Sequence, residues 1–238
     1  MHRSTTHRSS APRRQRRLLV GIVLITLLGA AAAASGVTLG ASATIDATVH
    51  DVPLDPELRA GLGTVTARSP DGDRVARLRL ERDGERVVLR GVLPDLAGSP
   101  LLEPITSLEL WPCPVNVTNR AHFLPVQLHA DGLGAVNLGT AAPAPDPLPG
   151  DVLLVFVYAD AAVSVAATCS GELDEPLVVD VRLHSGWNLL ASELVHDAGG
   201  RHLWLRASTA TERARARWFA GPSGTTGPRR LDVVPRGD

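Results

Sequence analysis

The N-terminal part of the chain contains a long apolar stretch without charge. Leu18 to Ile45 holds no charged side chain, and nine of the eleven residues in Leu18–Leu28 are Leu, Ile or Val. A membrane-spanning helix needs about 20 apolar residues, and the apolar region of a signal peptide needs about 7–15. The stretch falls between these two cases. We therefore predict one hydrophobic helix over residues 18–43 that is either a transmembrane anchor or a signal peptide.

The flanking charges predict how this segment is oriented. Residues 1–17 hold six arginines and no acid, and arginine-rich flanks stay on the cytoplasmic side of a membrane. Ala41-Ser42-Ala43 fits a small-x-small cleavage site, and the alanines at 30–34 offer further sites. Two locations follow: a single-pass protein of the cell membrane with its C-terminal part outside, or a secreted or periplasmic protein after cleavage.

Beyond the apolar segment, short stretches alternate apolar and polar residues. This period-2 alternation is typical of half-buried strands, and it occurs in Arg74–Leu80 and in Leu177–Leu183. Asp83-Gly84 predicts a hairpin turn into Arg86–Val92, and Asp131-Gly132 predicts a second hairpin. The strand is therefore the recurring element of the exported part.

Two stretches near the C-terminus add strands of other kinds. Val152–Tyr158 is apolar throughout, as expected of a central strand covered on both faces. Arg213–Phe219 places Arg213, Arg215 and Arg217 opposite small and aromatic residues. We interpret it as a strand whose arginine face is either solvated or in contact with anionic glycans or lipid head groups. Outside the apolar segment, a single helical turn is conceivable only at Ser208–Ala214.

The fold class follows from these elements. Many short strands separated by Gly, Pro and Asp predict an all-β protein, an antiparallel Ig-like β-sandwich behind one N-terminal hydrophobic helix. Residues 141–150 carry four prolines and form an extended connector. It either joins the halves of one sandwich or separates two small β sub-domains at 44–140 and 151–220, and we favour the second. Residues 221–238 are expected to be a disordered tail.

The distribution of charge excludes one class of partner. The part after residue 45 holds 18 arginines and all 25 acids, a formal charge of −7. Nucleic-acid binding is therefore not expected, because its electrostatic footprint is absent.

The two cysteines both lie in the exported part. Cys113 and Cys169 form an even pair in an oxidising compartment, which predicts a disulfide, with two buried free thiols as the alternative. No cysteine precedes Cys113, so there is no lipoprotein signal. Neither cysteine has a His or a second Cys at ligand spacing.

Histidines and one acid give the densest cluster of candidate chemistry. His184, His196, Asp197 and His202 fall within nineteen residues. They could bind a divalent metal, or act as a His-Asp acid/base pair. The alternative is that they are solvated side chains of turns, and we favour it. No cofactor and no metal site are assigned.

Ser185-Gly186-Trp187-Asn188 is the most distinctive short motif. Its simplest interpretation is a hairpin turn in which Gly186 adopts a positive φ and Trp187 packs back on the sheet. The alternative is a binding tip, with Trp187 and Asn188 holding a sugar or a partner loop.

A group of motifs resembles a known set of proteins. The motifs are Tyr158-Ala159-Asp160, Val163–Cys169, Val181–Asn188 and Arg217-Trp218-Phe219. They resemble uncharacterised exported proteins of the deinococcal bacteria, which carry a Tyr-Ala-Asp turn, a Cys-containing strand, a Gly-Trp-Asn hairpin and a closing tryptophan strand. The resemblance implies fold and location and carries no activity.

Together these observations predict an exported, membrane-anchored envelope protein with a non-catalytic binding or structural role. Residues 18–43 would contact the membrane, and the partner outside the cytoplasm would be a protein or a glycan. One alternative is an extracellular metal-assisted hydrolase that uses His184, His196 and His202. The other is a polysaccharide-binding module, which requires Trp187 or Trp204 to be exposed on a flat face.

Overall fold

The computed structural model describes residues 37–50, 63–107, 111, 113–130, 134–141, 148, 150–170, 176–198 and 200–220. The predicted helix up to residue 36, the proline residues of the connector and the tail at 221–238 lie outside these residues. Among the described residues, no helix is both long enough and apolar enough to cross a membrane.

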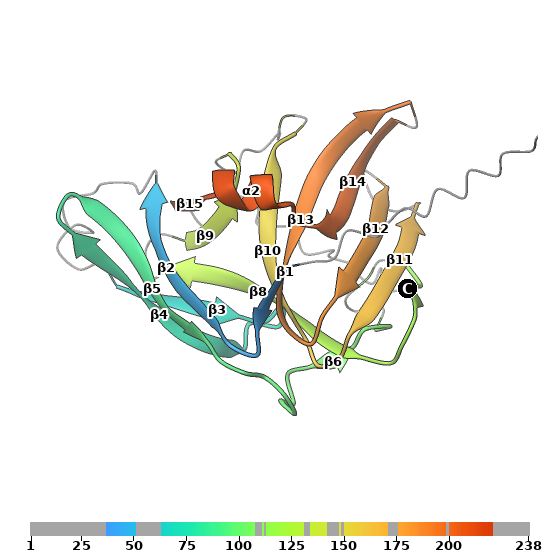
Figure 1. The fold of residues 1–238 in the computed structure, drawn as a ribbon, viewed down its shortest axis with the longest axis horizontal. Helices are drawn as coiled ribbons and strands as arrows, with labels where there is room; N and C mark the ends of the chain where they lie inside the picture. Colours follow the sequence, from blue (N-terminus) through green and yellow to red (C-terminus); the bar gives the residue numbers. More distant parts are fainter. Residues whose placement is uncertain are drawn as a thin grey trace, which may run out of the picture. The chain divides into compact units, whose positions relative to one another are not determined.

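The described part of the chain is built from fifteen strands and one short helix (Figure 1). This confirms the prediction of an all-β protein. The elements are β1 (Val37–Gly40), β2 (Ala43–His50), β3 (Thr64–Arg68), β4 (Arg74–Asp83), β5 (Arg86–Leu93), β6 (Glu103–Pro104), β7 (Asn116–Val117), β8 (His122–Ala130), β9 (Gly134–Gly139), β10 (Val152–Ala159), β11 (Val163–Cys169), β12 (Leu177–Leu183), β13 (Gly186–Asp197), β14 (Gly200–Ala207), α2 (Ala210–Arg215) and β15 (Arg217–Ala220).

The predicted β4–β5 hairpin is confirmed. Asp83 pairs with Arg86, so the turn has two residues, and Gly84 adopts a φ of +63°, which such tight hairpin turns require. Side chains alternate across β4, with Leu78 and Leu80 buried and Arg77 and Arg79 exposed. The β8–β9 hairpin is present as well, because Ala130 pairs with Gly134.

Eight strands form a closed circuit of pairings, which we call the strand ring. Its order is β8-β3-β4-β5-β2-β15-β9-β10, and β10 returns to β8. Near their turn, β8 and β9 pair directly with each other. Further from the turn, β10 lies between these two strands and pairs with both. A sheet that closes on itself is barrel-like, whereas the Ig-like sandwich predicted from the sequence consists of two separate packed layers.

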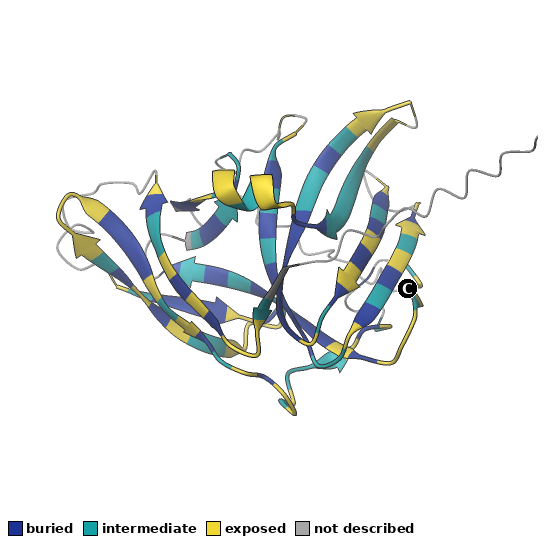
Figure 2. Ribbon diagram, in the orientation of Figure 1, coloured by how far each residue is buried: buried dark blue, intermediate teal, exposed yellow. Residues whose placement is uncertain are grey.

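A large apolar core lies among the strands of the ring, and a second core lies on the other face of β10 (Figure 2). Leu154, Phe156 and Tyr158 belong to the first core, while Val157 and Ala159 belong to the second. The second core is lined further by β11, β12 and β13. This confirms that Val152–Tyr158 is apolar throughout because both faces of the strand are covered. Strands from both sides of the 141–150 connector line each core, and the division into sub-domains at that connector stays a prediction.

The predicted N-terminal helix does not extend to residue 43. Val37–Gly40 forms β1 and pairs with β13, and Ala43 is a buried residue of β2. Val37 and Thr38 are β-branched and favour a strand. Gly40 has a φ of +91°, which ends β1 before the chain turns into β2. Residues 37–43 therefore belong to the β structure.

The predicted strand at Arg213–Phe219 is also wrong over its first half. Ala210–Arg215 is the helix α2, and the strand begins only at Arg217. Thr209 accepts a hydrogen bond from the backbone of Glu212, and the Glu212 side chain accepts one from the backbone of Thr209. This capping box starts a helix at Thr209 and outweighs the alternation of Arg and Ala.

The Gly-Trp-Asn segment begins β13, which is not a neighbour of the preceding strand β12. β14 lies between β12 and β13, parallel to β12 and antiparallel to β13. The predicted hairpin is therefore wrong in its pairing, although Gly186 has a φ of +96° and a tight turn is present, as expected.

Candidate ligand-binding pocket beside helix α2

A cavity of about 400 Å³ lies where α2 and β15 approach β2, β10 and β13. This volume is at the lower end of the range of small-molecule sites, roughly 300–1,000 Å³. We call it the α2 pocket. Its lining residues come from five stretches of the chain and are Ala47, Thr48, His50, Leu138, Leu154, Leu189, Arg213, Ala216, Arg217 and Trp218.

The ionisable groups of the α2 pocket are all basic. Arg213, Arg217 and His50 line it, and no aspartate or glutamate does so among the described residues. The residues after position 45 carry a formal charge of −7 as a whole, so the pocket differs in sign from the chain around it. Such a pocket favours an anionic ligand, because opposite charges attract most strongly where water is partly excluded.

Arg213 is held in place from one side. Its Nη1 donates to the backbone oxygen of Ser208 at 2.7 Å and to Ser208 Oγ at 3.3 Å. Ser208 is itself buried and donates through Oγ to the backbone oxygen of Leu189 at 2.8 Å. The arginine is therefore anchored to the β13 strand that forms part of the pocket wall.

Arg217 is held by the end of α2. Its Nη1 lies within hydrogen-bond distance of the backbone oxygens of Ala214, Arg215 and Ala216, at 3.3, 3.0 and 2.9 Å. The last carbonyls of a helix lack intrahelical partners, and a cation there is favourable. Among the described residues, the hydrogen bonds of Arg213 and Arg217 use Nη1 alone. The remaining N–H groups of both guanidinium groups are therefore available to a ligand.

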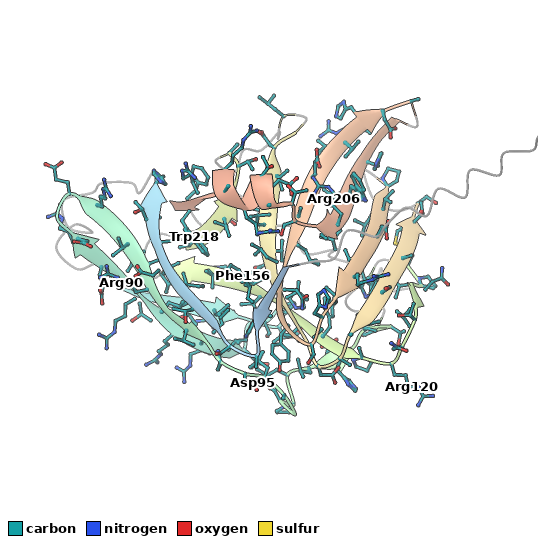
Figure 3. The ribbon with its side chains drawn as sticks, viewed as in Figure 1. Arg90, Asp95, Arg120, Phe156, Arg206 and Trp218 are labelled. Atoms are coloured by element: carbon teal, nitrogen blue, oxygen red, sulfur yellow. A yellow bond between two sulfur atoms is a disulfide. The ribbon has the colours of Figure 1, made fainter. Side chains whose placement is uncertain are left out.

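Apart from Thr48, the rest of the pocket wall is apolar. Leu138, Leu154, Leu189 and Trp218 line it, and the Trp218 ring is stacked on Phe156 with their centroids 5.9 Å apart (Figure 3). Trp218 is only 5% exposed, so its position is set by the ring core. The α2 pocket thus combines an apolar wall with fixed guanidinium groups.

Arg206 connects helix α2 to the sheet through two ion pairs. Arg206 Nη2 lies 2.5 Å from Glu193 Oε2 and 2.5 Å from Glu212 Oε1, and all three side chains are largely buried (Figure 3). Its hydrogen bond to Glu212 raises the pKa of the Arg206 guanidinium. Burial acts to raise the pKa of Glu212, but the hydrogen bond from Arg206 and the one from the Thr209 backbone outweigh it and hold that pKa below its usual value. Arg206 is thus fully neutralised, in contrast to the arginines of the pocket.

The histidine candidates are only partly brought together. His202 Nδ1 lies 4.0 Å from Asp197 Oδ1 at the β13–β14 hairpin, and His196 pairs with Arg201 in the same hairpin. His184 precedes β13 at its other end, roughly 35–40 Å away along an extended strand. Among the described residues, no group of three His, Cys, Asp or Glu side chains is arranged to hold a metal ion.

Trp187 and Asn188 do not form a binding tip, and that interpretation is wrong. Both are 0% exposed. Asn188 Nδ2 donates to the backbone oxygens of His184 and Gly186, at 2.8 and 2.9 Å, and Trp187 Nε1 donates to the backbone oxygen of Pro94 at 2.8 Å. These contacts stabilise the turn. Trp204 is half-buried, and the Arg206 guanidinium lies 5.1 Å from its ring centroid.

Cys113 and Cys169 are disulfide-bonded, as predicted, with their Cα atoms 5.5 Å apart. Such a distance is normal for a disulfide. Cys169 ends β11 and is buried in the second core, and Cys113 packs against that core. The bond therefore ties the segment before β7 to the far end of β11.

The sequence analysis did not identify a second polar pair, which His122 and Asp160 form. Asp160, the acid of the Tyr-Ala-Asp motif, accepts hydrogen bonds from the backbone N–H of His122 and from its Nδ1, both at 2.8 Å. The pair connects the end of β10 to the start of β8, which explains an acid at this turn. The pocket residue His50 was not identified either, and Trp218 was identified only as part of a strand motif, since the two come together only through long-range pairing.

Comparison with protein-family models, with curated proteins and with solved structures finds no match for this chain.

Proposed function

We propose that this chain is an exported protein of the cell envelope, held in the membrane by its N-terminal apolar segment, whose β structure binds a ligand without transforming it. The observation that carries the proposal is the α2 pocket. Its two arginines are oriented by hydrogen bonds to backbone carbonyls before any ligand arrives. Fixed donors of this kind reduce the entropy cost of binding.

Two features support an extracytoplasmic location. The arginine-rich start followed by an apolar segment is typical of an export signal. The bond between Cys113 and Cys169 is favoured in an oxidising compartment. The likeness to deinococcal exported proteins agrees with this location and is itself a proposal.

The finer fold class is part of the same proposal. The closed circuit of pairings favours a barrel-like ring over an Ig-like sandwich as the scaffold of the pocket. The hydrolase alternative has less support, because β13 separates His184 from His196. The polysaccharide alternative has less support because Trp187 is buried.

The location can be tested with reporter fusions to the C-terminus of the full chain. Alkaline phosphatase is active only outside the cytoplasm, and we expect activity from this fusion and none from a matched cytoplasmic reporter. We also expect the protein to stay with the membrane after alkaline washing. A cytoplasmic reporter signal would overturn export, and release by the wash would overturn the anchor.

A further inference from the structure

The geometry points to an amphiphile with an anionic head group, a carboxylate or a phosphate on an alkyl chain, as the ligand of the α2 pocket. This inference rests on the proposed binding function and adds the chemical class of the ligand. It is carried by the juxtaposition of Arg213 and Arg217 with the apolar wall formed by β9, β10, β13 and Trp218.

The head group is assigned from the arginines. A guanidinium recognises carboxylate and phosphate through paired N–H donors. Arg213 and Arg217 retain N–H groups beyond those bound to backbone oxygens among the described residues. Arg206 shows the contrasting case, because Glu193 and Glu212 already occupy it. No acid lines the pocket in the described part of the chain, so an anion from outside meets no internal competitor.

The alkyl chain is assigned from the rest of the wall. Six of the ten lining residues are Ala, Leu or Trp. Of these, Ala47, Leu138 and Ala216 are only half-buried. A bare anion would leave their apolar surface in contact with water, whereas an alkyl chain would cover it and gain free energy in proportion to the area removed from water. The mixed wall therefore fits an amphiphile better than inorganic phosphate.

The test uses the full chain in nanodiscs of phosphatidylcholine and follows tryptophan fluorescence. Trp218 lines the pocket, so brominated dodecanoate should quench wild-type fluorescence and should quench a Trp218→Phe variant less. Competition against this probe then ranks dodecanoate, dodecyl phosphate, acetate, inorganic phosphate and dodecyltrimethylammonium. We expect the two anionic amphiphiles to compete about tenfold or more better than the other three.

Variants locate the binding site. Arg213→Gln with Arg217→Gln should weaken binding of dodecanoate by about tenfold or more. Arg215→Gln is the matched control, since Arg215 is an exposed arginine of the same helix and lies outside the pocket lining. The double variant could disturb α2, so Ala47→Phe provides an independent change on β2. The larger side chain should fill the pocket and abolish quenching, while Ala47→Ser should preserve it.

The outcomes separate the possibilities. Quenching by brominated phosphatidylglycerol in the nanodiscs, without quenching by brominated dodecanoate, would identify a membrane lipid as the source of the anionic amphiphile; the reverse would identify a free single-chain molecule. Both support the inference. Equal competition by inorganic phosphate or by dodecyltrimethylammonium would overturn it, as would equal binding by Ala47→Phe. If a neutral ligand copurifies in the pocket, the proposed binding function stands and only the ligand class fails.

Discussion

Tyr158 donates its phenolic hydrogen bond to the carboxylate of Asp95, which lies 63 residues earlier in the chain. The Tyr158 ring meets Trp187 edge-on, with the centroids 5.4 Å apart, and Trp187 in turn donates to the backbone of Pro94. Asp95, labelled in Figure 3, lies in the segment that follows β5. These contacts bind that segment to β10 and β13.

This contact predicts an unusual titration of the tyrosine. Burial of the phenol, together with its hydrogen bond to Asp95, raises the pKa of Tyr158 to about 12. Tyr158 is the sole tyrosine of the chain, so the ultraviolet absorbance of tyrosinate reports it directly. We expect a midpoint near 12 for the folded protein and one near 10 in denaturant. A folded-state midpoint near 10 would contradict the contact.

The same group links stability to alkaline pH. The folded pKa lies above the unfolded one, so the stabilisation is fully present below the unfolded value of 10.0 and is lost as pH rises through about 12. Chemical denaturation should therefore show the wild-type protein losing stability across this window. Tyr158→Phe, measured in parallel, should lack that part of the decline.

The carboxylate of Asp95 links the stability of the protein to acidic pH. Its hydrogen bond from Tyr158, followed by one from the Ala97 backbone, lowers the pKa of Asp95. Its contribution is present above the unfolded value of 3.8 and is lost as pH falls through the lower folded value. Asp95→Asn should therefore flatten the acid side of the stability profile. An unchanged acid profile would count against this contact.

Position 186 requires glycine for two reasons, the backbone conformation there and the close approach of Gly40. It has a φ of +96°, and a Cβ at this position would collide with the backbone oxygen of Gly40 in β1. Gly200 has a φ of +102° with open space around it. Gly200→Ala should therefore cost about 1–2 kcal/mol from the backbone alone, and Gly186→Ala should cost clearly more. Equal losses in chemical denaturation would show that β1 does not pack there.

The placement of β1 predicts where any export cleavage must fall. Val37–Gly40 pairs with β13, so a cut after Ala43 would remove a strand of the folded protein. If a leader is removed, the mature chain should start at or before Val37. N-terminal sequencing of the exported protein decides this, and a mature chain beginning at Thr44 would contradict the role of β1.

The disulfide should contribute strongly to stability. The two cysteines are 56 residues apart, and closing such a loop stabilises a fold by about 4 kcal/mol in the chain-entropy estimate. Cys113→Ser with Cys169→Ser should lower the free energy of unfolding by that order. Reduced wild-type protein is the control and should match the double variant. A stability indifferent to reductant would refute this contribution.

Local patterns predicted the strands well and the long-range pairing poorly. The alternation in Leu177–Leu183 identified β12 because each residue faces either the second core or solvent. The prediction of a strand beginning at Arg213 was wrong. Arg and Ala alternate from Arg213 to Arg217, but the capping box at Thr209 starts a helix there. The closure of the ring depends on pairings such as Trp218 with Val49, about which a local pattern holds no information. The α2 pocket joins five separate stretches of the chain, so it could be found only in three dimensions.

The central claim is that the α2 pocket holds a ligand, and native mass spectrometry of the full chain purified gently from its own cells tests it most directly. We predict a bound small molecule on the wild-type chain and on Arg215→Gln. The same mass should be absent from Arg213→Gln with Arg217→Gln and from Ala47→Phe. A bare wild-type chain, or the same adduct on all four proteins, would contradict the claim.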